Sequence, residues 1–135
     1  MDIATALTIS ARGMQAQTER LRVIAENLAN QDSTGSSPGA APYQRRTTVF
    51  ENVLDRSLGV KTVQVESITA DKSAFPLKYD PSSPAADPSG YVRTPNVNSF
   101  VELMDMREAE RSYTANLNVM QASRAMLTRV IELLR

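Results

Sequence analysis

The sequence predicts a mainly α-helical protein with a small β-rich middle, whose long N- and C-terminal helices pair as a coiled coil. Three observations lead to this fold class. All seven prolines lie within residues 31–96, and proline costs about 3 kcal/mol in a helix interior. Apolar residues recur at heptad spacing in both flanking arms, which is the coiled-coil period. The middle instead alternates apolar and polar residues, as half-buried strands do.

The chain therefore divides into three predicted segments. Residues 1–30 form the N-terminal coiled-coil helix, residues 31–96 a loop with a small β-hairpin region, and residues 97–135 the C-terminal coiled-coil helix. The two helices are expected to form one core domain, because each is amphipathic and must cover its apolar stripe.

The N-terminal arm carries a heptad stripe with a polar centre. Its predicted helix- and subunit-packing residues are Ile3, Leu7, Met14, Leu21, Ile24 and Leu28. Between Ile3 and Ile24, the same column holds the polar residues Ser10 and Gln17. Polar residues in such a seam cost stability and commonly specify register and partner. This favours packing against neighbouring subunits, although an ordinary helical hairpin that buries its own core explains the stripe equally well.

The C-terminal arm has a longer stripe of the same kind. Its predicted packing residues are Leu103, Met106, Tyr113, Leu117, Met120, Leu127, Ile131 and Leu134. Glu110 and Arg124 interrupt the column that contains Leu103 and Leu117. The arm is expected to begin at Asn98 or Ser99, since either side chain can accept a hydrogen bond from a first-turn N–H.

The middle segment is predicted to hold short strands joined by turns. Val63 and Val65 alternate with polar Gln64, and Leu77 and Tyr79 repeat this pattern. The loops at residues 31–42 and 80–90 are rich in proline, glycine, serine and aspartate, which are turn-forming residues. This region can support only a small sheet.

Charge and composition exclude several function classes. The chain has 15 basic and 15 acidic residues, no cysteine and no histidine. Without a basic patch, nucleic acid is not an expected partner, and net neutrality favours association. No thiolate or imidazole is present for nucleophilic, acid–base or soft-metal chemistry. We therefore expect no enzymatic activity, no catalytic or metal-binding residues, no cofactor and no small-molecule substrate.

Carboxylate pairs are the remaining candidates for acid–base or hard-cation chemistry. Glu102 with Asp105 and Glu108 with Glu110 stand at helical spacing beside arginines. A solvated helix face is the expected interpretation of all four. The first residues also lack a basic and then apolar stretch, so no cleavable secretory signal is predicted.

Residues 24–30, Ile-Ala-Glu-Asn-Leu-Ala-Asn, resemble the N-terminal signature of the flagellar axial proteins, the rod and hook family. The signature residues are Asn27, Leu28, Ala29 and Asn30, while the family often carries Asn where this chain has Glu26. Further blocks at residues 41–51, 79–98 and 104–116 are similar to those of proximal-rod members. The likeness spans nearly the whole chain.

The resemblance implies a structural subunit of the bacterial flagellar basal body. Such a subunit assembles with copies of itself and with other rod subunits into the helical proximal rod, which transmits torque to hook and filament. It implies export by the flagellar type III apparatus without a cleaved signal, and a periplasmic position next to the membrane ring and export gate. The alternative is a soluble coiled-coil adaptor or export chaperone. A larger sibling axial protein is disfavoured by the short length.

Two interpretations remain open for the signature asparagines. Asn27 and Asn30 can end the first helix, because Asn is frequent at helix C-termini. Their side-chain amides can instead bond neighbouring subunits or the chain's own turn.

Overall fold

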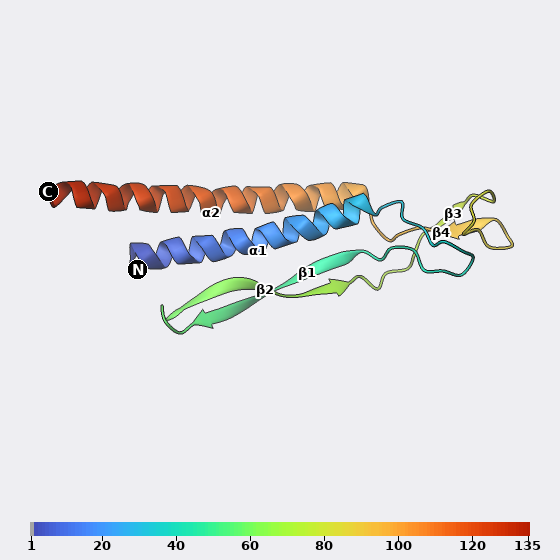
Figure 1. Ribbon diagram of the computed structural model, residues 1–135, viewed down its shortest axis with the longest axis horizontal. Coiled ribbons are helices and arrows are strands. Elements are labelled where there is room, and N and C mark those ends of the chain that lie inside the picture. Colours follow the sequence, from blue (N-terminus) through green and yellow to red (C-terminus); the bar gives the residue numbers. More distant parts are fainter. Residues whose placement is uncertain (1) are drawn as a thin grey trace.

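A computed structural model describes residues 2–135 and shows an elongated molecule (Figure 1). Its elements are, in chain order, α1 (Ile3–Ala29), β1 (Arg46–Asp55), β2 (Val60–Ala70), β3 (Leu77–Tyr79), β4 (Tyr91–Arg93) and α2 (Ser99–Leu133). The fold class is confirmed at this level: two long terminal helices flank two small antiparallel hairpins.

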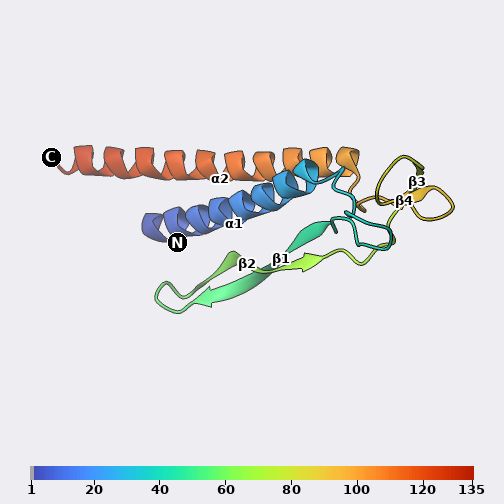
Figure 2. The same cartoon turned by 45° about the vertical axis from the view of Figure 1, so that its right-hand side comes forward.

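The elements form three layers over most of the length. Helix α1 runs antiparallel to α2 and lies between α2 and the β1–β2 hairpin, while the β3–β4 hairpin sits at the far end (Figures 1 and 2). Among the helices and strands, α1 alone contacts both α2 and the first hairpin. The N-terminal helix is therefore buried on two sides.

Helix α2 begins where a cap is available. The Asn98 side-chain oxygen accepts hydrogen bonds from the backbone N–H of Phe100 at 3.0 Å and of Val101 at 3.4 Å. These satisfy two of the N–H groups that a helix start leaves without an intrahelical partner. Of the two caps that the sequence allowed, Asn98 is the one used.

The surface of α2 that faces α1 contains the predicted heptad column of Met106, Tyr113 and Met120, which are half-buried. Its second column lies one residue earlier than predicted, at Glu102, Ala109, Asn116 and Ser123. Of these, Glu102, Ala109 and Ser123 are buried and Asn116 is half-buried. In contrast, Leu103, Glu110 and Arg124 are exposed in this chain, and Leu117 is half-buried. The contact thus uses small and polar residues where leucines were expected.

Glycine permits this close contact. A Cβ atom at Gly13 would lie 2.9 Å from the Asn116 side-chain oxygen. Gly13 and Ser10 are both buried in α1. Small residues at facing positions let two helix backbones approach closely, so the helix pair packs through Gly13 and Ala109 rather than through interlocked leucines alone.

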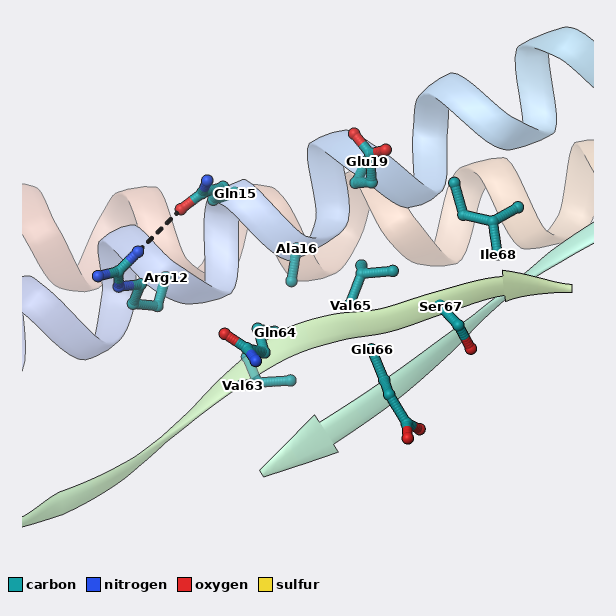
Figure 3. Close-up of a pocket in the computed structure, with 10 residues that line it drawn as sticks. All are labelled: Arg12, Gln15, Ala16, Glu19, Val63, Gln64, Val65, Glu66, Ser67 and Ile68. Atoms are coloured by element: carbon teal, nitrogen blue, oxygen red, sulfur yellow. Dashed lines mark hydrogen bonds between the residues drawn. The ribbon is translucent and has the colours of Figure 1, made fainter. Parts of the chain in front are cut away.

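The first hairpin contains a β-bulge that decides which side chains face α1. Val49 pairs with Ser67 and Phe50 pairs with Val65, leaving Glu66 as the extra residue. A bulge reverses the alternation of side chains beyond it. Val65 and Ile68, three residues apart, therefore both point toward α1 (Figure 3).

Turns in the middle segment repeat one local device, an Asp-x-Ser sequence at residues 55–57, 71–73, 80–82 and 87–89. In each, the aspartate carboxylate accepts the backbone N–H of the serine two residues on. Side-chain to backbone bonds of this kind stabilise tight turns. Between residues 2 and 135, neither long helix is apolar over a stretch sufficient to cross a membrane.

Candidate functional site

A buried polar junction joins the two helices to the strands. It lies where α1 ends, α2 begins and the chain enters β1 and leaves β2. Its central side chains are Asn27 from α1, Arg45 just before β1, Asp71 just after β2, Asn96 and Glu102 from α2. Each of these residues hydrogen-bonds a residue from another element or connecting segment.

Asn27 uses its whole side-chain amide within this junction. Its nitrogen donates to the Arg46 carbonyl oxygen at 2.8 Å and to the Glu102 carboxylate at 3.1 Å. Its oxygen accepts from the Tyr43 hydroxyl and the Arg46 N–H, both at 2.9 Å. The residue is only 1% exposed. Asn27 therefore binds the chain's own connection into β1, which is one of the alternatives left open above.

Asn30 behaves differently from Asn27. It is the C-cap residue of α1, and its side-chain nitrogen donates to the Glu26 carbonyl oxygen at 2.9 Å. The Asn30 backbone N–H donates to the same carbonyl at 3.1 Å, so backbone and side chain of this residue both bond the last turn of α1. The two asparagines of the signature thus have separate roles in this structure: one holds the tertiary junction and the other ends the helix.

Glu102 corrects an expectation from the sequence. The sequence predicts a solvated helix face for Glu102, yet the residue is 0% exposed and is the largest completely buried side chain described. Its carboxylate accepts a hydrogen bond from Arg45 Nε. Burying a carboxylate without a partner costs a large amount of free energy. The burial of Glu102 therefore favours its pairing with the Arg45 guanidinium.

Arg45 connects three carboxylates. Besides Glu102, its guanidinium lies 3.3 Å from Asp71 and 3.4 Å from Asp105. Burial opposes its charge, but the hydrogen bond and Coulombic attraction of Glu102, followed by those of Asp71, outweigh it and hold the pKa of Arg45 above its ordinary value. A guanidinium with five fixed donors suits such a multiple contact. Arg45 therefore fixes the end of β2 and the start of α2 relative to β1.

The strand connections close the junction through backbone groups. The Asn96 side chain accepts from the Arg45 N–H at 2.7 Å and donates to the Asp71 carbonyl oxygen at 3.0 Å. The Ser73 backbone N–H and hydroxyl, followed by Arg45, hold the pKa of Asp71 below its ordinary value. Sequence reasoning singled out neither Arg45 nor Asn96. Each lies within a block that resembles the proximal-rod members, residues 41–51 and 79–98, but that resemblance assigned neither side chain a role.

A groove separates α1 from β2 on the hairpin side. It has a volume of about 470 Å³, and Ala16, Val65 and Ile68 point into it (Figure 3). Arg12 and Glu19 stand at its helical edge, where Arg12 donates to Gln15 and Glu19 pairs with Arg22. The hairpin is thus held firmly at its base by the junction and more loosely along its length. Within residues 2–135, acidic side chains do not gather in a group of three that could hold a metal ion.

Comparison with known proteins shows which family this chain resembles. The family model described as "Flagellar basal body rod FlgEFG protein C-terminal" matches residues 89–133. "Flagellar basal-body rod protein FlgC" of Agrobacterium fabrum is 45% identical over 133 residues, covering 98% of this chain and 96% of that protein. The proteins of the same name from Borreliella burgdorferi and Salmonella typhimurium are each 35% identical. They cover 100% and 98% of this chain, and 99% and 98% of their own lengths.

The chain belongs to the flagellar basal-body rod protein FlgC family. It is a structural subunit of the flagellar basal-body rod. The resemblance inferred from residues 24–30 and the later blocks is thereby confirmed. In this member of the FlgC family, the departure at Glu26 has a local explanation, because its carboxylate pairs with Arg22 and lies 3.4 Å from Arg46.

The packing residues predicted for this FlgC-family chain fall into two groups. The first is buried or half-buried within the single chain: Ile3, Leu7, Met14, Leu21, Ile24, Leu28, Met106, Tyr113, Leu117 and Met120. The second is exposed: Leu103, Leu127, Ile131 and Leu134. Leu28 is half-buried and Ala29 exposed at the end of α1. Contacts between subunits remain a prediction for all of them.

Proposed function

We propose that this chain acts as a rigid structural subunit of the proximal rod and has no catalytic activity. It assembles with copies of itself and with other rod subunits into a helical drive shaft. The observation that supports this is the buried Arg45–Glu102 junction, which ties both helices and the first hairpin into one body. A torque-transmitting subunit must not bend between its elements. A salt bridge held in place by several further hydrogen bonds resists such bending more than an exposed pair does.

Coiled-coil contacts belong to this proposal. The apolar residues left exposed on α2 give each subunit surface to cover, and heptad spacing suits long helices packed side by side. We further propose that the chain is exported by the type III apparatus without a cleaved signal. It would then assemble in the periplasm, on the side of the membrane ring and export gate.

The test is deletion of the gene, followed by imaging of purified basal bodies and scoring of swimming. Cells that keep the membrane ring but lack rod, hook and filament are the expected result, and the wild-type gene should restore all three. Normal rotating flagella in the deletion strain would reject the rod proposal and favour the adaptor or chaperone.

Complementation with matched variants tests the part played by the junction. Glu102→Gln should restore few or no rods, because the substitution leaves Arg45 without its buried counter-charge. Glu66→Gln, at an exposed acid of the first hairpin, should restore swimming to the wild-type level. Equal restoration by both variants would show that rigidity at the junction is not needed for assembly.

A further inference from the structure

The second hairpin and the loop between its strands lie at the far end of the molecule (Figures 1 and 2). We call residues 77–93 the lobe. Among the helices and strands of residues 2–135, β3 and β4 contact only each other. The lobe therefore lies outside the body that the Arg45–Glu102 junction holds together.

The lobe is firmly bonded within itself. The Asp80 N–H donates to the Gly90 carbonyl oxygen at 2.9 Å. Asp87 and Tyr91 are joined twice, because the Asp87 N–H donates to the Tyr91 carbonyl oxygen and the Tyr91 N–H to the Asp87 carboxylate, each at 2.9 Å. The rings of Tyr79 and Tyr91 meet edge to face with their centroids 5.3 Å apart. This internal bonding favours movement of the lobe as one unit.

Two connecting segments carry the lobe and are tied to each other at two levels. Nearer the lobe, the Thr94 N–H donates to the Pro76 carbonyl oxygen at 2.8 Å. Nearer the junction, the Asn96 side chain donates to the Ser73 carbonyl oxygen at 3.2 Å. The segments are thus fixed to the body as far as the second level.

The ribbon has a weak point between these two levels. Residues 74 and 75 on the incoming segment stand against the single residue Pro95 on the outgoing one, and proline has no N–H to donate. Within residues 2–135, neither residue 74 nor residue 75 makes a backbone hydrogen bond. Two residues opposite one, without ladder bonds, allow a ribbon to bend.

Arg93 is the other attachment of the lobe. Its guanidinium donates to the carbonyl oxygens of Gly39 at 2.8 Å and Ala40 at 3.4 Å. These are the only hydrogen bonds between the lobe and the loop at residues 31–42 in the described part of the chain. Arg93 is exposed, so water competes for both bonds and their net contribution to stability is small.

The loop that accepts these bonds belongs to the rigid body, but the lobe does not fill the space against it. The Tyr43 N–H donates to the Ser33 carbonyl oxygen at 2.9 Å, and the Ser33 hydroxyl donates to the Asn30 side-chain oxygen at 3.1 Å. A cavity of about 240 Å³ lies between loop and lobe, where Leu77 and Tyr91 line it from the lobe. Arg93 therefore spans a gap.

We propose that the lobe is hinged at residues 74–75 and 95, and that Arg93 is the latch that holds it in the observed orientation. A bend in the ribbon and one exposed latch give a latched and a free state that differ little in free energy. A carboxylate offered to Arg93 would favour the free state, because a charge-assisted bond is stronger than bonds to neutral carbonyl groups. The inference goes beyond the proposed function, since it holds for a single subunit, and its failure would leave the rod proposal intact.

Spin labels test the hinge in the purified chain, which has no native cysteine. Lys78→Cys in the lobe and Thr114→Cys on α2 are both at exposed positions and carry the labels. Double electron–electron resonance should give one dominant distance in this labelled parent. Adding Arg93→Gln should roughly double the width of the distance distribution, because the lobe then samples further orientations. Lys72→Gln, which removes an exposed cation just before the hinge, is the control and should leave the width unchanged.

Hydrogen exchange separates turning of the lobe from its unfolding. The amides of Asp80, Asp87 and Gly90 donate to carbonyl oxygens within the lobe, so their exchange should stay as slow in Arg93→Gln as in the parent. A wider distance distribution with these amides protected is the expected result. A distribution no wider than that of Lys72→Gln would overturn the latch, and faster exchange at the three amides would overturn movement as a unit.

Discussion

Asn27 and Asn30 are three residues apart at one helix end, yet their side chains make very different sets of hydrogen bonds. Asn27 makes four hydrogen bonds to three elements or connections, with its side chain inaccessible to water. Asn30 makes one bond that caps its own helix and accepts a second from the exposed Ser33 hydroxyl. Removing a buried partner leaves the opposing polar groups without hydrogen bonds, which costs more than the bond itself contributed.

The first prediction compares these two residues. Asn27→Ala should lower the free energy of unfolding by about 3–5 kcal/mol, because the polar groups that Asn27 bonds stay buried and lose their hydrogen-bond partner. Asn30→Ala should lower it by about 1 kcal/mol, as loss of one ordinary hydrogen bond does. Urea denaturation followed by circular dichroism measures both. Equal effects would contradict the view that Asn27 holds the junction.

The second prediction concerns acid. Hydrogen bonds from serine N–H and hydroxyl groups hold the pKa of Asp55, Asp71 and Asp80 below the ordinary value of 3.8. Below that value the unfolded chain binds more protons than the folded chain, so stability rises with pH there. The contribution is complete above about pH 4 and is lost as the pH falls through the lowered values.

Asp71→Asn checks this linkage at one site. Asparagine cannot titrate, so the urea midpoint of the variant should fall less steeply between pH 5 and pH 2.5 than that of the wild type. Parallel pH profiles for the two proteins would show that Asp71 does not contribute to the acid sensitivity.

At the scale of elements, the residues that pack α1 against α2 include several that are too small to form a seam of leucines. Gly13, Ala109 and Ser123 are buried between or beside the helices, and the Gln17 side-chain oxygen is buried there without a hydrogen-bond partner in the described part of the chain. An unpartnered buried acceptor costs stability. The pair of helices therefore owes its register to steric fit, with the larger apolar residues at its flanks.

The third prediction tests that fit with a double-mutant cycle. Gly13→Ala alone should destabilise the protein by about 1 kcal/mol, because its new methyl group meets the Asn116 side chain. In an Asn116→Ala background, the same change should stabilise it by up to about 1 kcal/mol through the better helix propensity of alanine. Thermal or urea unfolding of the four proteins gives the coupling energy. Additive effects would indicate that the two residues are not in contact.

At the scale of the whole molecule, one arginine links layers that otherwise meet through α1. The first hairpin touches α1 along a groove, and in the described part of the chain Arg45 ties it to α2 at its base. Loss of that link should loosen the hairpin before the helices separate. Sub-global opening of this kind is visible in hydrogen exchange.

The fourth prediction compares neighbouring arginines. Arg45→Ala should lower stability by about 3 kcal/mol, since it leaves Glu102 buried without its counter-charge. Amide exchange in β1 and β2 should accelerate more than in the middle of α1. Arg46→Ala removes an exposed pair with Glu26 and should cost less than about 1 kcal/mol. Uniform acceleration over the whole chain in Arg45→Ala would contradict the view that Arg45 holds the base of the hairpin on α2.

The sequence alone determined the two helices, the strand-forming middle and a cap of α2 at Asn98 or Ser99, because each depends on local chemistry. Proline exclusion, heptad spacing and a side chain that bonds its own backbone are all visible within a few residues. The family was also visible, through blocks that recur in order along the whole chain.

Tertiary structure decided the rest. The bulge at Glu66 turned Ile68 toward α1, and the buried column of α2 fell one residue before the predicted leucines. Glu102 became a buried anion only because Arg45, 57 residues earlier, reaches it. Burial and ion pairing depend on which segments meet in space, and no local pattern in one sequence records that meeting.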